Sequence, residues 1–177
     1  MFHSNLPMRG FVADLIIASE DPLMNVAFIN PFIESTLRSL EMMAGITAEK
    51  TGLSVKEDLI TTYDISAIIG LTGETSGSII ISVPEALACK IASNMLMEEI
   101  DTMNRAVEDA IGEIGNIVVG DARRTLIQDG HQLNISIPTV VVGAGHKISR
   151  SGDIPCIAIP FSTEFGDFEV NVGLQER

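Results

Sequence analysis

Tryptophan is absent from this sequence of 177 residues, and aromatic residues make up only 5% of it. Because 46% of the residues are nevertheless hydrophobic, the interior must be built mainly from Ile, Val, Leu, Met and Ala side chains. A core of this kind suits helices packed on a sheet. The length is enough for one domain with a substantial core.

Cysteine is also scarce. Cys89 and Cys156 have no paired spacing, which argues against a disulfide scaffold and against a zinc site. None of the three histidines has a ligand partner at metal-binding spacing. We therefore expect no metal and no other cofactor bound by this chain, and a reducing, cytoplasmic environment.

Long apolar runs are missing as well. No segment approaches the ~20 apolar residues of a membrane span. Residues 1–29 lack the charged head, the long apolar stretch and the small-residue cleavage site of a signal peptide. We therefore predict no association with a membrane.

Basic residues are few, because 11 Lys and Arg stand against 24 Asp and Glu, for a formal net charge of −13. Binding to nucleic acid would bring these carboxylates toward phosphates, so we predict no nucleic-acid partner. The basic face of another protein is the partner that this charge favours, although many acidic proteins are simply soluble.

The spacing of apolar residues predicts three helices and six strands. The first helix should begin at Asn30 and Pro31 and end at Gly45. A loop over residues 72–76 should join two strands, and Gly166-Asp167 should form the last hairpin turn. The predicted helices span residues 30–44, 85–97 and 104–129, and the predicted strands span residues 54–61, 63–71, 77–83, 138–142, 154–162 and 168–174.

The order of elements repeats along the chain. A helix followed by strands with a glycine-bearing turn runs over residues 30–83 and again over residues 104–174. We interpret this as an α/β domain of duplicated helix-plus-strand halves, which form one antiparallel-leaning sheet packed with helices. Chance similarity between α/β segments is the alternative. The single domain should span residues 24–177, with residues 1–23 as an arm or as a start-site artefact ahead of Met24.

The third predicted helix combines an apolar stripe with a polar ridge. At about 100° per residue, Asp109, Glu113 and Asn116 fall at i, i+4 and i+7 and line one narrow strip. The apolar stripe lies nearly opposite and should face the core. Its members are Val107, Ala110, Ile111, Ile114, Val118 and Ala122.

Three glycines interrupt the same helix. Gly112, Gly115 and Gly120 each cost roughly 1 kcal/mol relative to alanine in a helix interior. Two interpretations stay open. The glycines either let another protein surface approach closely, or they let the helix pack tightly on its own sheet.

The spacing Asp109-x-x-x-Glu113-x-x-Asn116 resembles the Asp/Ser-x-x-x-Glu-x-x-Asn signature of the CheC/CheX/FliY chemotaxis phosphatases. Residues 110–122, residues 30–45 and the repeated α/β order are also similar to that family, so the resemblance covers about residues 24–174. It implies a phosphatase that hydrolyses the aspartyl phosphate of a CheY-like response regulator. It also implies a homodimer that pairs through sheet edges.

The resemblance further implies a role for each ridge residue. Asn116 would hold the attacking water, and Glu113 would reach a basic residue of the partner and fix the docking. Asp109, Gly112 and Gly120 would belong to the docking surface. The Mg²⁺ of the reaction is expected on the phosphorylated partner. In the first helix, the corresponding positions would be Ser35, Ser39 and Met42, which depart from the signature, so one CheX-like site per chain is expected.

Two other functions compete with a receiver phosphatase. A module of the same fold could bind receivers or flagellar and chemotaxis proteins without hydrolysis, but such an adaptor has no need of Asn116. A small-substrate hydrolase could use Asp109 and Glu113 as a carboxylate pair, but an exposed ridge is unlike the concave pockets of such enzymes.

Overall fold

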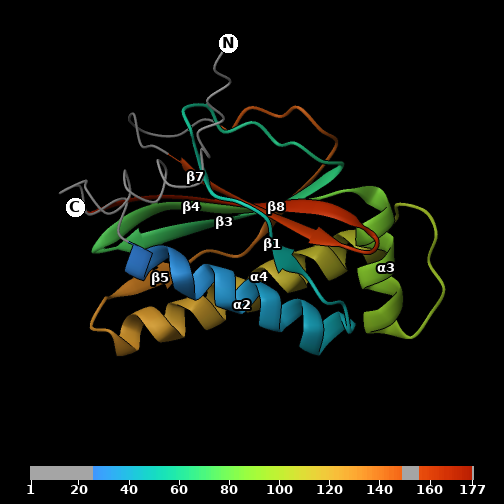
Figure 1. The fold of residues 1–177 in the computed structure, drawn as a ribbon, viewed down its shortest axis with the longest axis horizontal. Coiled ribbons are helices and arrows are strands. Elements are labelled where there is room, and N and C mark those ends of the chain that lie inside the picture. The colour runs from blue at the N-terminus through green and yellow to red at the C-terminus, as the bar shows by residue number, and fades with distance from the viewer. Residues whose placement is uncertain (1–25, 149–155, 177) are drawn as a thin grey trace, which may run out of the picture.

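The computed structural model describes residues 26–148 and 156–176. The predicted arm, residues 1–23, and the first two residues of the predicted strand 154–162 lie outside the described residues. Within the described ranges, three helices pack on one eight-stranded sheet (Figure 1). The helices are α2 (Val26–Ala44), α3 (Glu85–Leu96) and α4 (Arg105–Gln128); the strands are β1 (Glu49–Lys50), β2 (Ser54–Lys56), β3 (Ile65–Gly73), β4 (Thr75–Val83), β5 (Leu133–Ile135), β6 (Thr139–Val142), β7 (Cys156–Thr163) and β8 (Gly166–Glu176).

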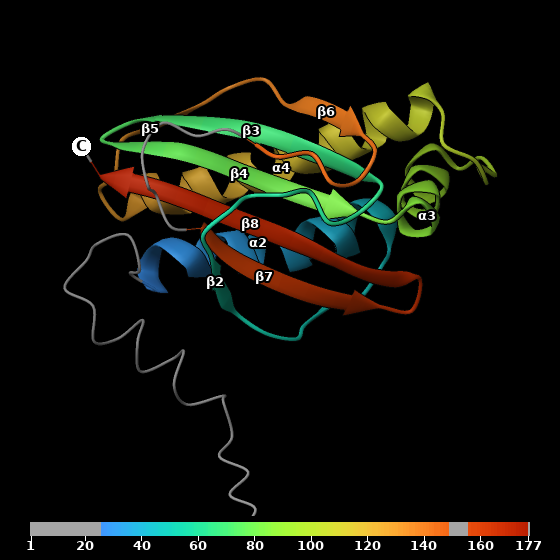
Figure 2. The same cartoon turned by 90° about the horizontal axis from the view of Figure 1, so that it is seen from above.

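The strand order explains how the two predicted halves combine. The sheet runs β1-β7-β8-β4-β3-β5, with β2 also beside β7 and β6 also beside β3, and every pairing is antiparallel (Figure 2). Each half supplies a helix, two short strands and a long hairpin. The short strands of one half pair with the hairpin of the other, and β4 and β8 join the halves at the centre. The predicted α/β class with one antiparallel sheet is confirmed.

The predicted start of the first helix is wrong. Helix α2 already includes Val26 and contains Pro31, which lacks the N–H of a helical hydrogen bond. The longer helix buries Phe28 and Ile29, which are 5% and 4% exposed. Burial of two such side chains is worth roughly 3–6 kcal/mol and outweighs the hydrogen bond that proline cannot make.

Both predicted hairpin turns are displaced, because the strands continue further than their apolar residues indicate. Strand β3 ends at Gly73 and β4 begins at Thr75, so the predicted loop over residues 72–76 shrinks to Glu74. A side chain at Gly73, which has a φ of +129°, would meet the Gln132 carbonyl. The last turn falls on residues 164–165 rather than on Gly166-Asp167.

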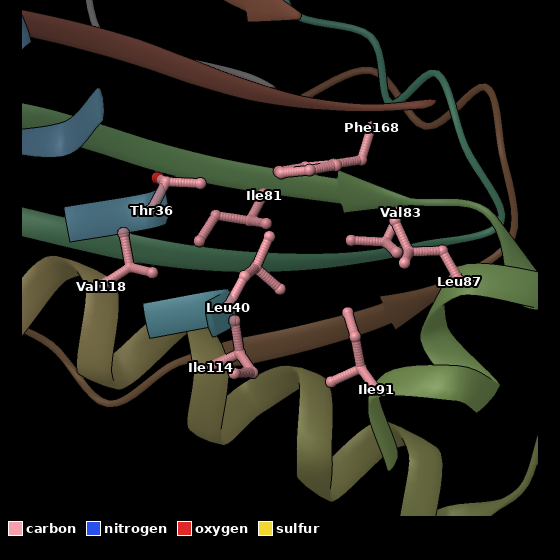
Figure 3. A pocket seen from close by; sticks show the side chains of 9 residues that line it. All are labelled: Thr36, Leu40, Ile81, Val83, Leu87, Ile91, Ile114, Val118 and Phe168. Carbon is pink, nitrogen blue, oxygen red and sulfur yellow. The ribbon is translucent and has the colours of Figure 1, made fainter. Parts of the chain in front are cut away.

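The core lies between the helices and the sheet, and it is tightly filled. One gap between the helices and the sheet has a volume of only about 10 Å³, the room of about one water molecule. Figure 3 shows the apolar side chains around this gap, among them Leu40, Ile91, Ile114 and Phe168. The single hydroxyl at the gap, that of Thr36, donates to the Phe32 carbonyl at 2.7 Å. The only hydroxyl proton at the gap is therefore already used within α2.

A membrane-spanning helix would need to be longer and more apolar than any helix within residues 26–148 and 156–176.

Asn104 caps the N-terminus of α4, the helix that carries the ridge. Its Oδ1 accepts hydrogen bonds from the N–H groups of Ala106 and Val107 at 2.9 and 3.1 Å. We predict that Asn104→Ala lowers the free energy of unfolding by about 1 kcal/mol, because two N–H groups lose their acceptor. Asn104→Asp keeps the acceptor and should retain most of the stability. Urea unfolding checks both variants, and equal losses would contradict the capping role.

Candidate active site

Helix α4 carries the predicted site residues on the face turned away from the sheet. Asp109, Glu113 and Asn116 are all exposed. The structure therefore brings the two acids and the amide together on one ridge, as their spacing predicts. The opposite face of the helix is buried and comprises Val107, Ala110, Ile111, Ile114, Gly115, Val118, Val119, Ala122 and Leu126.

The glycines of α4 separate into two kinds. Gly115 faces the sheet, where an added Cβ would lie 3.0 Å from Ala67 Cβ and 3.1 Å from Ile69 Cδ1. This glycine lets the helix pack closely on β3. Gly120 is different, because no atom lies within 4 Å of a Cβ built there. Packing within the chain therefore explains Gly115 and leaves Gly120 unexplained.

One groove borders the ridge on the side of the sheet edge formed by β5 and β6. It has a volume of about 480 Å³ and is lined by residues that include Asp109, Glu113 and Asn116. Gly112 also lines it, and a Cβ there would lie 3.2 Å from Val140 Cγ2, so a larger residue would narrow the groove.

The outer wall of this first groove comes from residues 135–140, which the sequence interpretation did not assign to the site. Ile137 stands on that wall with 89% of its surface exposed. The only sequence signal for it is an isoleucine followed by Pro138 between two short strands, which is too common to be informative.

A second groove borders the ridge on the opposite side, where α2 lies against α4. Its volume is about 460 Å³, and its wall on α4 begins at Ile117, directly after Asn116. Gly120 also lines it. Asn116 therefore stands between two grooves of similar size rather than inside a pocket.

The ridge side chains are only weakly engaged within the chain. Asp109 lies 4.0 Å from Arg105, and both side chains are well exposed, so this ion pair contributes little to stability. Neither Glu113 nor Asn116 makes a side-chain hydrogen bond or ion pair with the residues that the structure describes. Their polar atoms are therefore available to another molecule.

Metal-binding geometry is not found among the described residues, where no three His, Cys, Asp or Glu side chains gather around a common point.

Helix α2 does not carry a second ridge of the same kind. Ser35 and Ser39 are 0% and 3% exposed, so the correspondence expected from the sequence is wrong, because both lie in the core. The exposed residues at i, i+4 and i+7 of α2 are Glu34, Arg38 and Glu41. None of them is an amide, so the exposed positions of α2 do not repeat the signature, and one CheX-like site per chain stays a prediction.

Comparison with known proteins decides the family. The model of the family described as chemotaxis phosphatase CheX matches residues 65–162, which include all of α4. The CheY-P phosphatase CheX of Thermotoga maritima is 30% identical over 151 residues, which make up 84% of this chain and 97% of that protein. The chain belongs to the CheX family.

Solved structures of CheX-like proteins share the fold. A CheC-like superfamily protein from Shewanella sp. PV-4 has a TM-score of 0.79 and 34% identity, over 85% of this chain and 99% of that one. The CheX–CheY–BeF₃–Mg²⁺ complex from Borrelia burgdorferi contains a chain with a TM-score of 0.69 and 29% identity, over 84% of this chain and 98% of that one. The resemblance to CheX seen in the sequence is therefore confirmed.

Gly115 and Gly120 offer a matched test of how α4 is seated in this CheX-family chain. Gly115→Val should lower the free energy of unfolding by about 1–3 kcal/mol, because the Ala67 methyl is fixed to the strand and cannot rotate away. Gly120→Val should leave stability unchanged or raise it by a few tenths of a kcal/mol, because the position is open and valine favours helix more than glycine does. Urea unfolding of both variants checks this, and a larger loss at Gly120 would refute the assignment of the two glycines.

Proposed function

We propose that this chain hydrolyses the aspartyl phosphate of a CheY-like receiver, with Asn116 positioning the attacking water and Glu113 docking on a basic residue of the receiver. The observation that carries this proposal is the unengaged amide of Asn116, held on a rigid helix between two open grooves. Membership of the CheX family and the name of the Thermotoga maritima relative support the substrate class. The complex of CheX with CheY from Borrelia burgdorferi supports the kind of partner.

The ridge suits a substrate that brings most of the reaction centre with it. A phosphorylated receiver carries an acyl phosphate together with a divalent cation and a lysine that neutralise phosphoryl charge. Phosphoryl transfer depends mainly on positioning and electrostatics, so a water held in line with the phosphorus is the missing part. In the reaction, the water oxygen bonds to phosphorus, the bond from phosphorus to the aspartyl oxygen breaks, and the carboxylate leaves. The proton of the water passes to the inorganic phosphate or to solvent.

An amide is well suited to hold that water. The Asn116 carbonyl oxygen can accept a hydrogen bond from the water, while its NH₂ group can donate to a phosphoryl oxygen. A carboxylate at this position would keep the acceptor but would add negative charge beside the phosphoryl group. The helix is anchored along its buried face, so the amide approaches the receiver without ordering a loop.

Asn116→Ala should lower the stimulated rate of phosphate release by about 100-fold or more, because the water loses its anchor. Binding to a receiver loaded with BeF₃⁻ and Mg²⁺, a stand-in for the phosphorylated form, should change by no more than a few-fold. Phosphate release is measured with a phosphorylated CheY-type receiver, and binding by calorimetry. The matched control is Asn134→Ala, an exposed asparagine on β5, which should behave as wild type. Retained hydrolysis in Asn116→Ala would exclude the water-positioning role, whereas wild-type binding without hydrolysis would favour a non-catalytic docking module.

Glu113→Gln should weaken receiver binding about tenfold, because a charge-assisted contact to a basic residue becomes a neutral one. The loss should shrink at high salt, where exposed charges are screened. Glu98→Gln, at an exposed acid between α3 and α4, removes the same charge from elsewhere on the surface and should bind as wild type. Equal weakening in both variants would mean that only the net charge matters.

The homodimer implied by the resemblance stays a prediction. Light scattering of the purified chain should give twice the monomer mass of 19.0 kDa.

A further inference from the structure

The groove between α2 and α4 has a composition that packing alone does not explain. Met42 and Met43 are 76% and 40% exposed and lie beside Ile117 on its walls. Figure 1 shows the two helices side by side. Between Ile117 and Arg124 on the α4 wall, Gly120 has no side chain to fill the groove. Scattered apolar residues are normal on a surface, but apolar side chains gathered in one groove mark a contact site.

The charge of this second groove differs from that of the chain as a whole. Arg38 Nη2 lies 2.7 Å from Asp121 Oδ2, and Arg124 Nη1 lies 3.0 Å from Asp121 Oδ1. Two guanidinium groups share one carboxylate, so the charged residues that line this groove carry a net positive charge, on a chain of net charge −13. The first groove is acidic, because Asp109 and Glu113 line it. The groove on one side of Asn116 is therefore acidic, and the groove on the other side is basic.

The helix dipole accounts for part of this order. It favours acids near the start of a helix and basic residues near its end. It does not account for Arg38, which is on a different helix, or for the exposed methionines.

The second groove lies within reach of any protein that contacts Asn116. A transient interface buries roughly 600 Å² per partner, which corresponds to a disc of roughly 14 Å radius. Arg124 is eight residues after Asn116, which is ~12 Å along the helix axis, and α2 lies at the usual helix spacing of roughly 8–10 Å from α4. A receiver seated on Asn116 that buries this area extends along α4 to Gly120 and Arg124, and Met42 lines the same groove as these two residues.

We infer that the groove formed by Arg38, Met42, Met43, Ile117, Gly120 and Arg124 is a specificity site for the receiver, and this inference rests on the proposed function. The occupant is the surface of the receiver that flanks its phosphorylation site on the side away from the lysine. It places an apolar side chain against Met42 and Met43 and a carboxylate against Arg124 and Arg38. The bare helix at Gly120 lets the receiver backbone approach closely. The receiver is thereby oriented by two opposite charges, with its lysine toward Glu113 and its carboxylate toward Arg124.

The test measures binding of a CheY-type receiver loaded with BeF₃⁻ and Mg²⁺ to three variants of the full chain. Met42→Ser should raise the Kd about tenfold, because an apolar contact is lost. Arg124→Ala should raise the Kd at low salt and much less at high salt. Met97→Ser is the control, since Met97 is 95% exposed at the end of α3, outside both grooves, and this variant should bind as wild type.

Phosphate release separates this inference from the proposed function. Slow release by Met42→Ser should recover when the concentration of the variant is raised, whereas Asn116→Ala should not recover. An unchanged Kd in Met42→Ser, or an equal loss in Met97→Ser, overturns the specificity site while leaving the phosphatase intact.

Light scattering tests a second copy as the occupant. A lower mass in Met42→Ser with unchanged receiver affinity would make the groove a self-association surface and overturn the inference. If the wild type neither binds nor dephosphorylates the receiver, the proposed function fails and this inference fails with it.

Discussion

The contact between α4 and strand β3 at Gly115 is the constraint on which the site depends. Because Gly115 has no side chain, the helix lies directly against Ala67 and Ile69. The buried stripe then fixes both the rotation and the height of a helix of 24 residues. Asn116 is the next residue, so the position of its amide is set by the packing of the core. A rigid element holds a functional side chain more accurately than a loop does.

This rigidity matters because the site has no pocket of its own. An amide on an open ridge cannot bind and orient a small molecule, since it excludes no water and surrounds nothing. It can act on a protein that carries its own phosphoryl group, cation and lysine into the contact. Under the proposed function, the exposure of Asn116 is what lets its amide reach the phosphoryl group of a docked receiver. The two grooves leave room for a partner on both sides of the amide.

The sequence predicts the parts of this arrangement that depend on one continuous pattern. Helix α4 has a regular apolar stripe, so both its length and the exposure of Asp109, Glu113 and Asn116 follow from periodicity. The different roles of Gly115 and Gly120 do not follow from periodicity, because they depend on which strand lies beneath the helix. The second groove could not be predicted from the sequence either. Met42 and Gly120 are 78 positions apart (120 − 42), and they line one groove only because α2 packs beside α4. Strands β1 and β5 are not predicted, because two or three residues show no alternation.

Duplication gives the fold two equivalent helices, and the structure uses them differently. A symmetric chain would present the same ridge on α2, but the exposed positions of α2 carry Glu34, Arg38 and Glu41 instead of a signature. Arg38 and Met42 are exposed residues of α2 that line the groove beside α4. In the proposed arrangement, α4 supplies the amide and α2 helps to select the partner, so both helices act on a single docked receiver.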